Sequence, residues 1–119
     1  MTTCIRVGCD LVFLPRFEQT IKSGGQELLQ RLFTEHELAY ADRLERLAGI
    51  FAIKESMIKA LGKAPQTWHD MEIYHEHGKP FVRCTMQASI MHSDVSVTHD
   101  GDYAFACVVL VLPKDKCIE

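Results

Sequence analysis

Two carboxylates and a lysine are the side chains whose types and spacing most directly suggest chemistry. Asp10 stands near the end of an apolar, buried-looking run, where a carboxylate must be paired, hydrogen-bonded or metal-bound. Glu55 and Lys59 are one turn apart in a helical segment. Magnesium is typically held by one or two carboxylates, while water and phosphate oxygens fill its other positions. Asp10 and Glu55 could therefore form an open magnesium site, with Lys59 able to touch a phosphate on the metal.

Each of these residues also has an ordinary structural explanation. Asp10 can be a cap or turn residue, and Glu55 can form a surface ion pair with Lys59. Helical periodicity does not show that Asp10 and Glu55 meet, so both explanations stay open at this stage. Lys54 falls within the apolar arc of the same segment. Its ammonium either snorkels to solvent, which we favour slightly, or serves a buried carboxylate or an anionic ligand.

The histidines give a weaker signal. His99 ends an alternating run beside Asp100-Gly101, where a turn histidine with no further role is the default, although it could donate to a phosphate. His75 and His77 alone are poor evidence for zinc, which needs three or four ligands. We expect these two to be exposed at the end of a strand.

The order of the elements predicts an α+β fold. The first half should contain a strand followed by helices. The strand covers residues 4–13 and is interrupted at Gly8, and a short helix over 14–22 is stopped by Gly24-Gly25. A second helix runs from the capping box of Thr34 and Glu37 to about Leu44. A long helix over 43–61 is ended by Gly62.

The second half should form an antiparallel meander. Its predicted strands cover residues 71–75, 81–86, 95–99 and 103–112, with turns at Gly78-Lys79-Pro80 and Asp100-Gly101.

Bulk composition excludes several classes of protein. The 119 residues suit one domain over 1–119. We expect no membrane partner, because no apolar run approaches the ~20 residues that span a bilayer, and no signal-peptide pattern is visible. The net charge of −3 with scattered basic residues argues against nucleic acid. The five cysteines include no C-x-x-C pair, so no disulfide framework or zinc knuckle is indicated and a reducing cytoplasm is the simplest setting.

Several ordered motifs resemble one enzyme family. Gly8-Cys9-Asp10 resembles the G-x-D signature of 4'-phosphopantetheinyl transferases, and residues 51–62 (F-A-I-K-E-S-M-I-K-A-L-G) closely resemble their F-A-x-K-E-x-x-x-K-A-x-G helix. The short length, Arg16, Gly78-Lys79-Pro80 and residues 95–99 (V-S-V-T-H) are similar to the holo-acyl-carrier-protein synthase group. The resemblance covers nearly the whole chain in the right order.

This resemblance implies a reaction and a set of roles. The phosphopantetheine arm of coenzyme A would pass to a serine of an apo acyl carrier protein, releasing adenosine 3',5'-bisphosphate. Asp10 and Glu55 would hold Mg²⁺ on the pyrophosphate and Lys59 would assist there, while Arg16 would contact the acidic recognition helix of the carrier. The implied coenzyme A contacts are Lys59, Gly62, Lys79, Pro80, Thr98 and His99.

The resemblance also implies an architecture. An antiparallel sheet would pack against a long helix, and a homotrimer would place its sites between subunits. Two departures affect coenzyme A binding: Ile50 stands where the family often has Arg, and Lys63-Ala64-Pro65 replaces a longer Gly-rich stretch, so that Lys63 could replace a lost contact. The competing hypotheses are a non-catalytic module that binds coenzyme A or a carrier protein, and an α+β domain with an accidental motif match.

Overall fold

A three-stranded antiparallel sheet forms the base of the fold in this computed structural model, which describes residues 2–87 and 89–117. Strand β1 (Thr3–Phe13) pairs along its full length with β5 (Tyr103–Pro113), and β4 (His92–Asp100) lies on the other side of β5. Strands β2 (Met71–Glu76) and β3 (Lys79–Cys84) form a separate hairpin. The four strands predicted for the second half are present as two antiparallel hairpins, β2–β3 and β4–β5. The prediction of one continuous meander is wrong, because β3 and β4 belong to different sheets and β5 pairs with β1.

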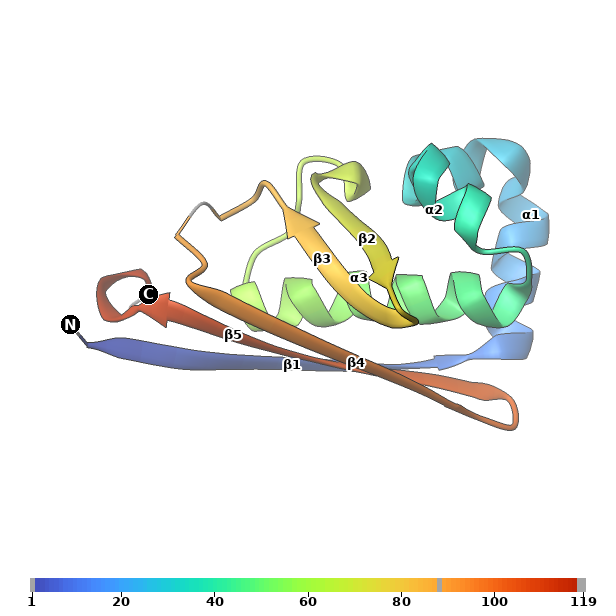
Figure 1. Cartoon of the computed structure of the whole chain (residues 1–119). Helices are drawn as coiled ribbons and strands as arrows, with labels where there is room; N and C mark the ends of the chain where they lie inside the picture. The colour runs from blue at the N-terminus through green and yellow to red at the C-terminus, as the bar shows by residue number, and fades with distance from the viewer. Residues whose placement is uncertain (1, 88, 118–119) are drawn as a thin grey trace.

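The helices lie together on one side of this sheet (Figure 1). They are α1 (Leu14–Leu32), α2 (Glu35–Tyr40) and α3 (Leu44–Leu61), with short 3-10 turns η1 (Trp68–Asp70) and η2 (Lys114–Lys116). The predicted stop at Gly24-Gly25 is a kink instead: Gly25 has φ 64° and ψ −159°, and the helix resumes to Leu32. Helix α2 has the predicted capping box but ends earlier than expected. None of the described helices is long and apolar enough to cross a membrane.

Helix α3 forms the centre of the core. It lies along β1 and β5, while α1, α2 and the β2–β3 hairpin cover its other side (Figure 1). Its buried residues therefore cover more than half of its circumference, as expected for a helix with other elements on two sides. The predicted end at Gly62 is confirmed, because this glycine takes the left-handed C-cap conformation with φ 72°.

Gly8 is the point of closest approach between β1 and α3. The strand continues through it without the predicted interruption. A Cβ atom at this position would lie 1.9 Å from the carbonyl oxygen of Ser56 and 2.8 Å from the backbone nitrogen of Ala60. Only glycine allows the strand to pack on the helix backbone here, and this contact sets the distance between Asp10 and α3.

Gly8→Ala is expected to destabilise the protein by about 3 kcal/mol, the upper end of ordinary overpacking costs. The added methyl group meets backbone atoms, which cannot rotate out of its way. Urea denaturation measures the change in the free energy of unfolding. Gly49→Ala in α3 is the comparison variant, because its Cβ would lie 3.3 Å from side-chain atoms of His99 and Val97, which can shift, and not against backbone atoms. An equal decrease in the free energy of unfolding for Gly8→Ala and Gly49→Ala would contradict the close approach of β1 and α3 at Gly8.

The cysteine prediction is wrong for one pair. Cys4 and Cys117 form a disulfide, with their Cα atoms 6.4 Å apart, whereas Cys9, Cys84 and Cys107 are free. Thr3 pairs with Pro113, so the start of β1 and the segment after β5 lie side by side. Sequence spacing does not reveal such a pair, because it joins residues 113 positions apart.

The other face of the three-stranded sheet is apolar and exposed. Within the described part of the chain, the helices and the β2–β3 hairpin all lie on the opposite side (Figure 1). Side chains on a strand alternate between faces, so odd-numbered residues of β1 and β5 point away from α3. We call this surface the open sheet face; its large exposed residues are Ile5, Val7, Leu11, Tyr103, Phe105 and Val109.

Candidate active site

Asp10 and Lys59 meet across the boundary between β1 and α3. The Lys59 ammonium lies 3.1 Å from Asp10 Oδ1 and donates to the backbone oxygen of Cys9 at 3.0 Å. The Asp10 side chain is 16% exposed, and that of Lys59 is 54% exposed. Lys59 thus forms its ion pair with Asp10, which lies on another element. Helical spacing had suggested an ion pair with Glu55 instead.

Glu55 shares a cavity with Asp10. Both residues line a cavity of about 290 Å³ with apolar walls that include Phe17 and Phe51. Burial raises the pKa of Glu55, the charge of Asp10 raises it further, and Lys59 opposes both effects. The structure therefore brings the two carboxylates into electrostatic contact, which the sequence alone did not establish.

The donor set of this cavity suits magnesium. A divalent cation would relieve the electrostatic repulsion between the two carboxylates. Lys59 already balances part of their charge. The described residues contain no group of three or more His, Cys, Asp or Glu that could enclose a metal. An open two-carboxylate arrangement leaves coordination positions for substrate phosphate and water, as Mg²⁺ sites commonly do.

Arg16 lies at the edge of the same cavity. It belongs to the first turn of α1, directly after the end of β1, and its side chain is exposed. Its guanidinium lies 5.5 Å from the centre of the Phe13 ring. A cation at this place can meet an acidic partner that approaches Asp10 and Glu55.

His99 and Pro80 line a second, larger cavity of about 440 Å³. His99 reaches from β4 to α3, where its Nε2 lies 3.0 Å from the backbone oxygen of Glu45. Gly49 allows this approach, since it presents no side chain to the imidazole. The cationic side chains of Arg43 and Arg46 also line this cavity, and guanidinium groups can bind phosphate oxygens through paired hydrogen bonds.

The prediction that His75 is an exposed strand-end residue is wrong. Its ring is half-buried and stacks on Tyr40 with the ring centres 3.8 Å apart, beside the larger cavity. Burial lowers the pKa of His75, and the positive charges of His36 and Arg46 lower it further. Its Nδ1 atom is buried with no hydrogen-bond partner. A ligand in the cavity could supply that partner.

The remaining predicted coenzyme A residues are dispersed. Lys79 pairs with Asp94 at 2.8 Å, and Thr98 lies opposite Phe105 on the open sheet face. Gly62 ends α3, and Lys63 donates to Gln87 at 3.1 Å and lines a different cavity. A single chain therefore does not gather these residues and the Asp10–Glu55 cavity into one site.

Sequence reasoning missed four residues of the larger cavity: Tyr40, Arg43, Arg46 and His75. No motif marks them, because they come from two helix ends and a strand that converge only in the fold. The snorkelling interpretation of Lys54 is wrong as well. This lysine is fully buried and pairs with the buried carboxylate of Glu37 at 2.8 Å, which was the alternative interpretation.

Sequence comparison with known proteins points to the same family as the motifs and the fold. A family model described as the 4'-phosphopantetheinyl transferase superfamily matches residues 6–108. The chain is 37% identical to a holo-acyl-carrier-protein synthase of Geobacter sulfurreducens, covering 89% of this chain and 96% of that protein.

Two solved structures have the same architecture. The holo-acyl-carrier-protein synthase of Helicobacter pylori in complex with coenzyme A superimposes with a TM-score of 0.81 at 26% identity, covering 87% of this chain and 98% of that one. An ACPS–CoA complex from Chronobacterium ammoniagenes has a TM-score of 0.77 at 28% identity, covering 92% and 98%.

These matches define the chain as an enzyme of the phosphopantetheinyl transferase class with an α+β fold, in which an antiparallel sheet packs against a long helix. Within that class, the chain belongs to the holo-acyl-carrier-protein synthase family.

Proposed function

We propose that this protein transfers the 4'-phosphopantetheine arm of coenzyme A to a serine of an apo acyl carrier protein, with adenosine 3',5'-bisphosphate as the second product. The observation that carries the proposal is the cavity shared by Asp10 and Glu55, with Lys59 paired to Asp10. These are the three residues to which the family resemblance assigns the metal and pyrophosphate chemistry.

Asp10 and Glu55 would hold Mg²⁺, which when bound would neutralise charge on the pyrophosphate of coenzyme A. Lys59 is well placed to exchange its contact with Asp10 for a phosphate oxygen, because its side chain is about half exposed. Phe17 and Phe51 keep one wall of the cavity apolar, which limits the access of water to the reacting phosphate. Arg16 would orient the acidic surface of the carrier beside this cavity.

The larger cavity would hold the rest of coenzyme A. Arg43, Arg46 and His99 would contact its phosphate groups, and the unpartnered Nδ1 of His75 would pair with a polar atom of the ligand. The arginines compensate for Ile50, which is 2% exposed and lines the same cavity without a charge. Pro80 contributes to the wall, whereas Lys79, Thr98 and Gly62 would reach coenzyme A from other surfaces of the assembly.

We further propose a homotrimer whose sites lie between subunits. The Asp10–Glu55 cavity and the larger cavity share no lining residue, so one chain separates the two halves of the proposed site. The open sheet face supplies the apolar surface that such assembly would cover. A cyclic arrangement would bring the carboxylate half of one chain to the larger cavity of the next.

A cytoplasmic location and a single domain over residues 1–119 complete the proposal. The three free cysteines support a reducing compartment, and the Cys4–Cys117 bond opposes it.

Mass spectrometry of the carrier tests the reaction directly. After incubation with apo acyl carrier protein, coenzyme A and Mg²⁺, the carrier is expected to gain the mass of one phosphopantetheine group, and the gain should disappear when EDTA replaces the metal. Absence of any gain with several carriers would refute transferase activity. Binding of coenzyme A without transfer would then identify a non-catalytic module.

A further inference from the structure

Three consecutive residues of α3 point into three different regions of the protein. Successive residues of a helix are separated by about 100° around its axis. Lys54 points into the layer formed by α1, α2 and β2, and Ser56 points toward the sheet. Glu55 lies between them and lines the cavity that contains Asp10. The direction of Glu55 therefore depends on how its two neighbours are held.

Lys54 is held by three acceptors from three elements. Its ammonium donates to the backbone oxygen of Leu32 at 2.8 Å, to Glu37 Oε1 at 2.8 Å and to the backbone oxygen of Trp68 at 3.3 Å. These acceptors belong to the end of α1, to α2 and to η1. The side chain of Lys54 has no exposed surface, and neither has that of Glu37.

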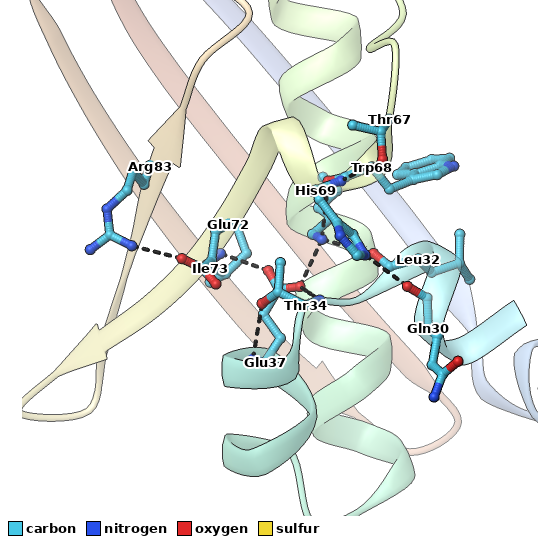
Figure 2. Close-up of polar contacts among 11 residues, drawn as sticks. Gln30, Leu32, Thr34, Glu37, Thr67, Trp68, His69, Glu72, Ile73 and Arg83 are labelled. Carbon is cyan, nitrogen blue, oxygen red and sulfur yellow. Dashed lines mark hydrogen bonds and ion pairs between the residues drawn. The ribbon is translucent and has the colours of Figure 1, made fainter. Parts of the chain in front are cut away.

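Glu37 extends the network to the β2–β3 hairpin (Figure 2). Its Oε1 also accepts from the backbone nitrogen of Thr34 at 2.8 Å, and its Oε2 accepts from that of Ile73 at 2.7 Å. The buried pair thus connects α3 to α1, α2, η1 and β2. Apolar packing is non-directional, whereas hydrogen bonds fix orientation.

Ser56 holds the opposite side of the helix. Its hydroxyl contacts the backbone oxygen of Ala52 at 2.7 Å and that of Ala106 on β5 at 3.3 Å. The close approach at Gly8 fixes the same side of α3 against β1. Rotation of α3 about its axis is consequently restrained from both sides of Glu55.

We propose that the buried Lys54–Glu37 pair is a positioning device that fixes the rotation of α3 so that Glu55 faces Asp10. The inference rests on the proposed metal role of these two carboxylates. A purely structural pair could be replaced by uncharged residues of similar volume with little loss, because buried ion pairs contribute little net stability. A positioning pair, in contrast, affects the metal site even when the variant remains folded.

The test is the double variant Lys54→Met/Glu37→Gln, which removes both buried charges at similar volume. Mn²⁺ binding, measured by electron paramagnetic resonance in the full-length protein, is expected to weaken about 10- to 100-fold, the range found for residues that orient metal ligands. The kcat should fall by a similar factor, while KM for coenzyme A changes little, because the larger cavity does not contain this pair.

Lys54→Met alone is the second variant, because the Glu37 carboxylate that it leaves keeps its hydrogen bonds from the backbone nitrogens of Thr34 and Ile73; circular dichroism shows whether each variant is folded. Arg83→Met serves as the control, because its side chain is exposed and contacts Glu72 (Figure 2) and the ring of Tyr74 but not the buried pair, so Mn²⁺ binding should be unchanged.

Wild-type Mn²⁺ affinity and kcat in both folded variants would overturn the proposal and leave the pair a stabilising role only. If the wild-type protein with coenzyme A bound no Mn²⁺, the proposed metal site would fail, and this inference with it. Mn²⁺ binding by the wild-type protein therefore shows whether the proposed metal site is wrong or only the positioning role of the buried pair.

Discussion

Glu55→Gln is expected to reduce turnover about a thousandfold, because several kcal/mol of charge stabilisation depend on the metal and about 4 kcal/mol corresponds to that factor. The amide keeps the shape of the side chain but loses the charge that would hold Mg²⁺ together with Asp10. The rate of phosphopantetheine transfer to the carrier measures the effect. Full activity in the variant would remove Glu55 from the site.

The same substitution is expected to raise the melting temperature of the metal-free protein at pH 7. Burial and the charge of Asp10 raise the pKa of Glu55 in the folded state above its ordinary value. The ionised group therefore destabilises the fold above that raised pKa, and the penalty disappears as pH falls below the unfolded pKa of about 4.3.

Melting curves in EDTA at pH 7 and near pH 4 should show the difference between wild type and Glu55→Gln only at the higher pH. Glu76→Gln, at an exposed position on β2, should alter neither turnover nor this difference. A lower melting temperature for Glu55→Gln at pH 7 would contradict the electrostatic account of the cavity.

Val7→Asp is expected to disrupt the proposed trimer and give a folded, inactive monomer. Val7 is 59% exposed within one chain and lies on the open sheet face. In the proposed trimer this position would be covered, and an unpaired buried carboxylate costs several kcal/mol. Light scattering coupled to size-exclusion chromatography gives the mass, and circular dichroism shows whether the monomer remains folded.

Val7→Thr is the matched control, because it keeps the branched shape and adds no charge, so it should remain trimeric and active. A trimeric, active Val7→Asp variant would show that the open sheet face is not the contact between subunits.

Mixing variants tests whether the site spans two chains. Glu55→Gln disables the carboxylate half and Arg46→Ala weakens the larger cavity. If each site uses one half from each of two neighbours, randomly mixed trimers should recover about a quarter of wild-type activity. No recovery after exchange of subunits would place both halves in a single chain.

Local sequence predicted the elements that depend on neighbouring residues. The capping box of Thr34 and Glu37, the long helix ended by Gly62 and the hairpin at Gly101 are all present, because each is stabilised by interactions within a few residues. The spacing of Glu55 and Lys59 likewise fixed their places on one helix. Motif order then identified the family from Gly8-Cys9-Asp10 and residues 51–62.

Contacts between distant elements could not be predicted in this way. Lys59 pairs with Asp10, 49 positions earlier, and not with Glu55 on its own helix. Lys54 finds Glu37 in the core and not solvent. The arginine, histidine and tyrosine side chains of the larger cavity belong to elements that no common motif connects. Periodicity specifies which face of an element a residue occupies, but not which other element will cover that face.

Asp10 and Glu55 show this division most clearly. The sequence by itself determined their chemical type, the strand and the helix that carry them, and the family whose metal ligands they resemble. Their meeting in one cavity was decided by packing: Gly8 lets β1 approach the backbone of α3, and polar contacts on both sides of Glu55 restrain the helix rotation. Asp10 and Glu55 are 45 positions apart in the sequence, and they meet only because such contacts pack β1 against α3 in one orientation. No local sequence pattern specifies a contact between residues so far apart.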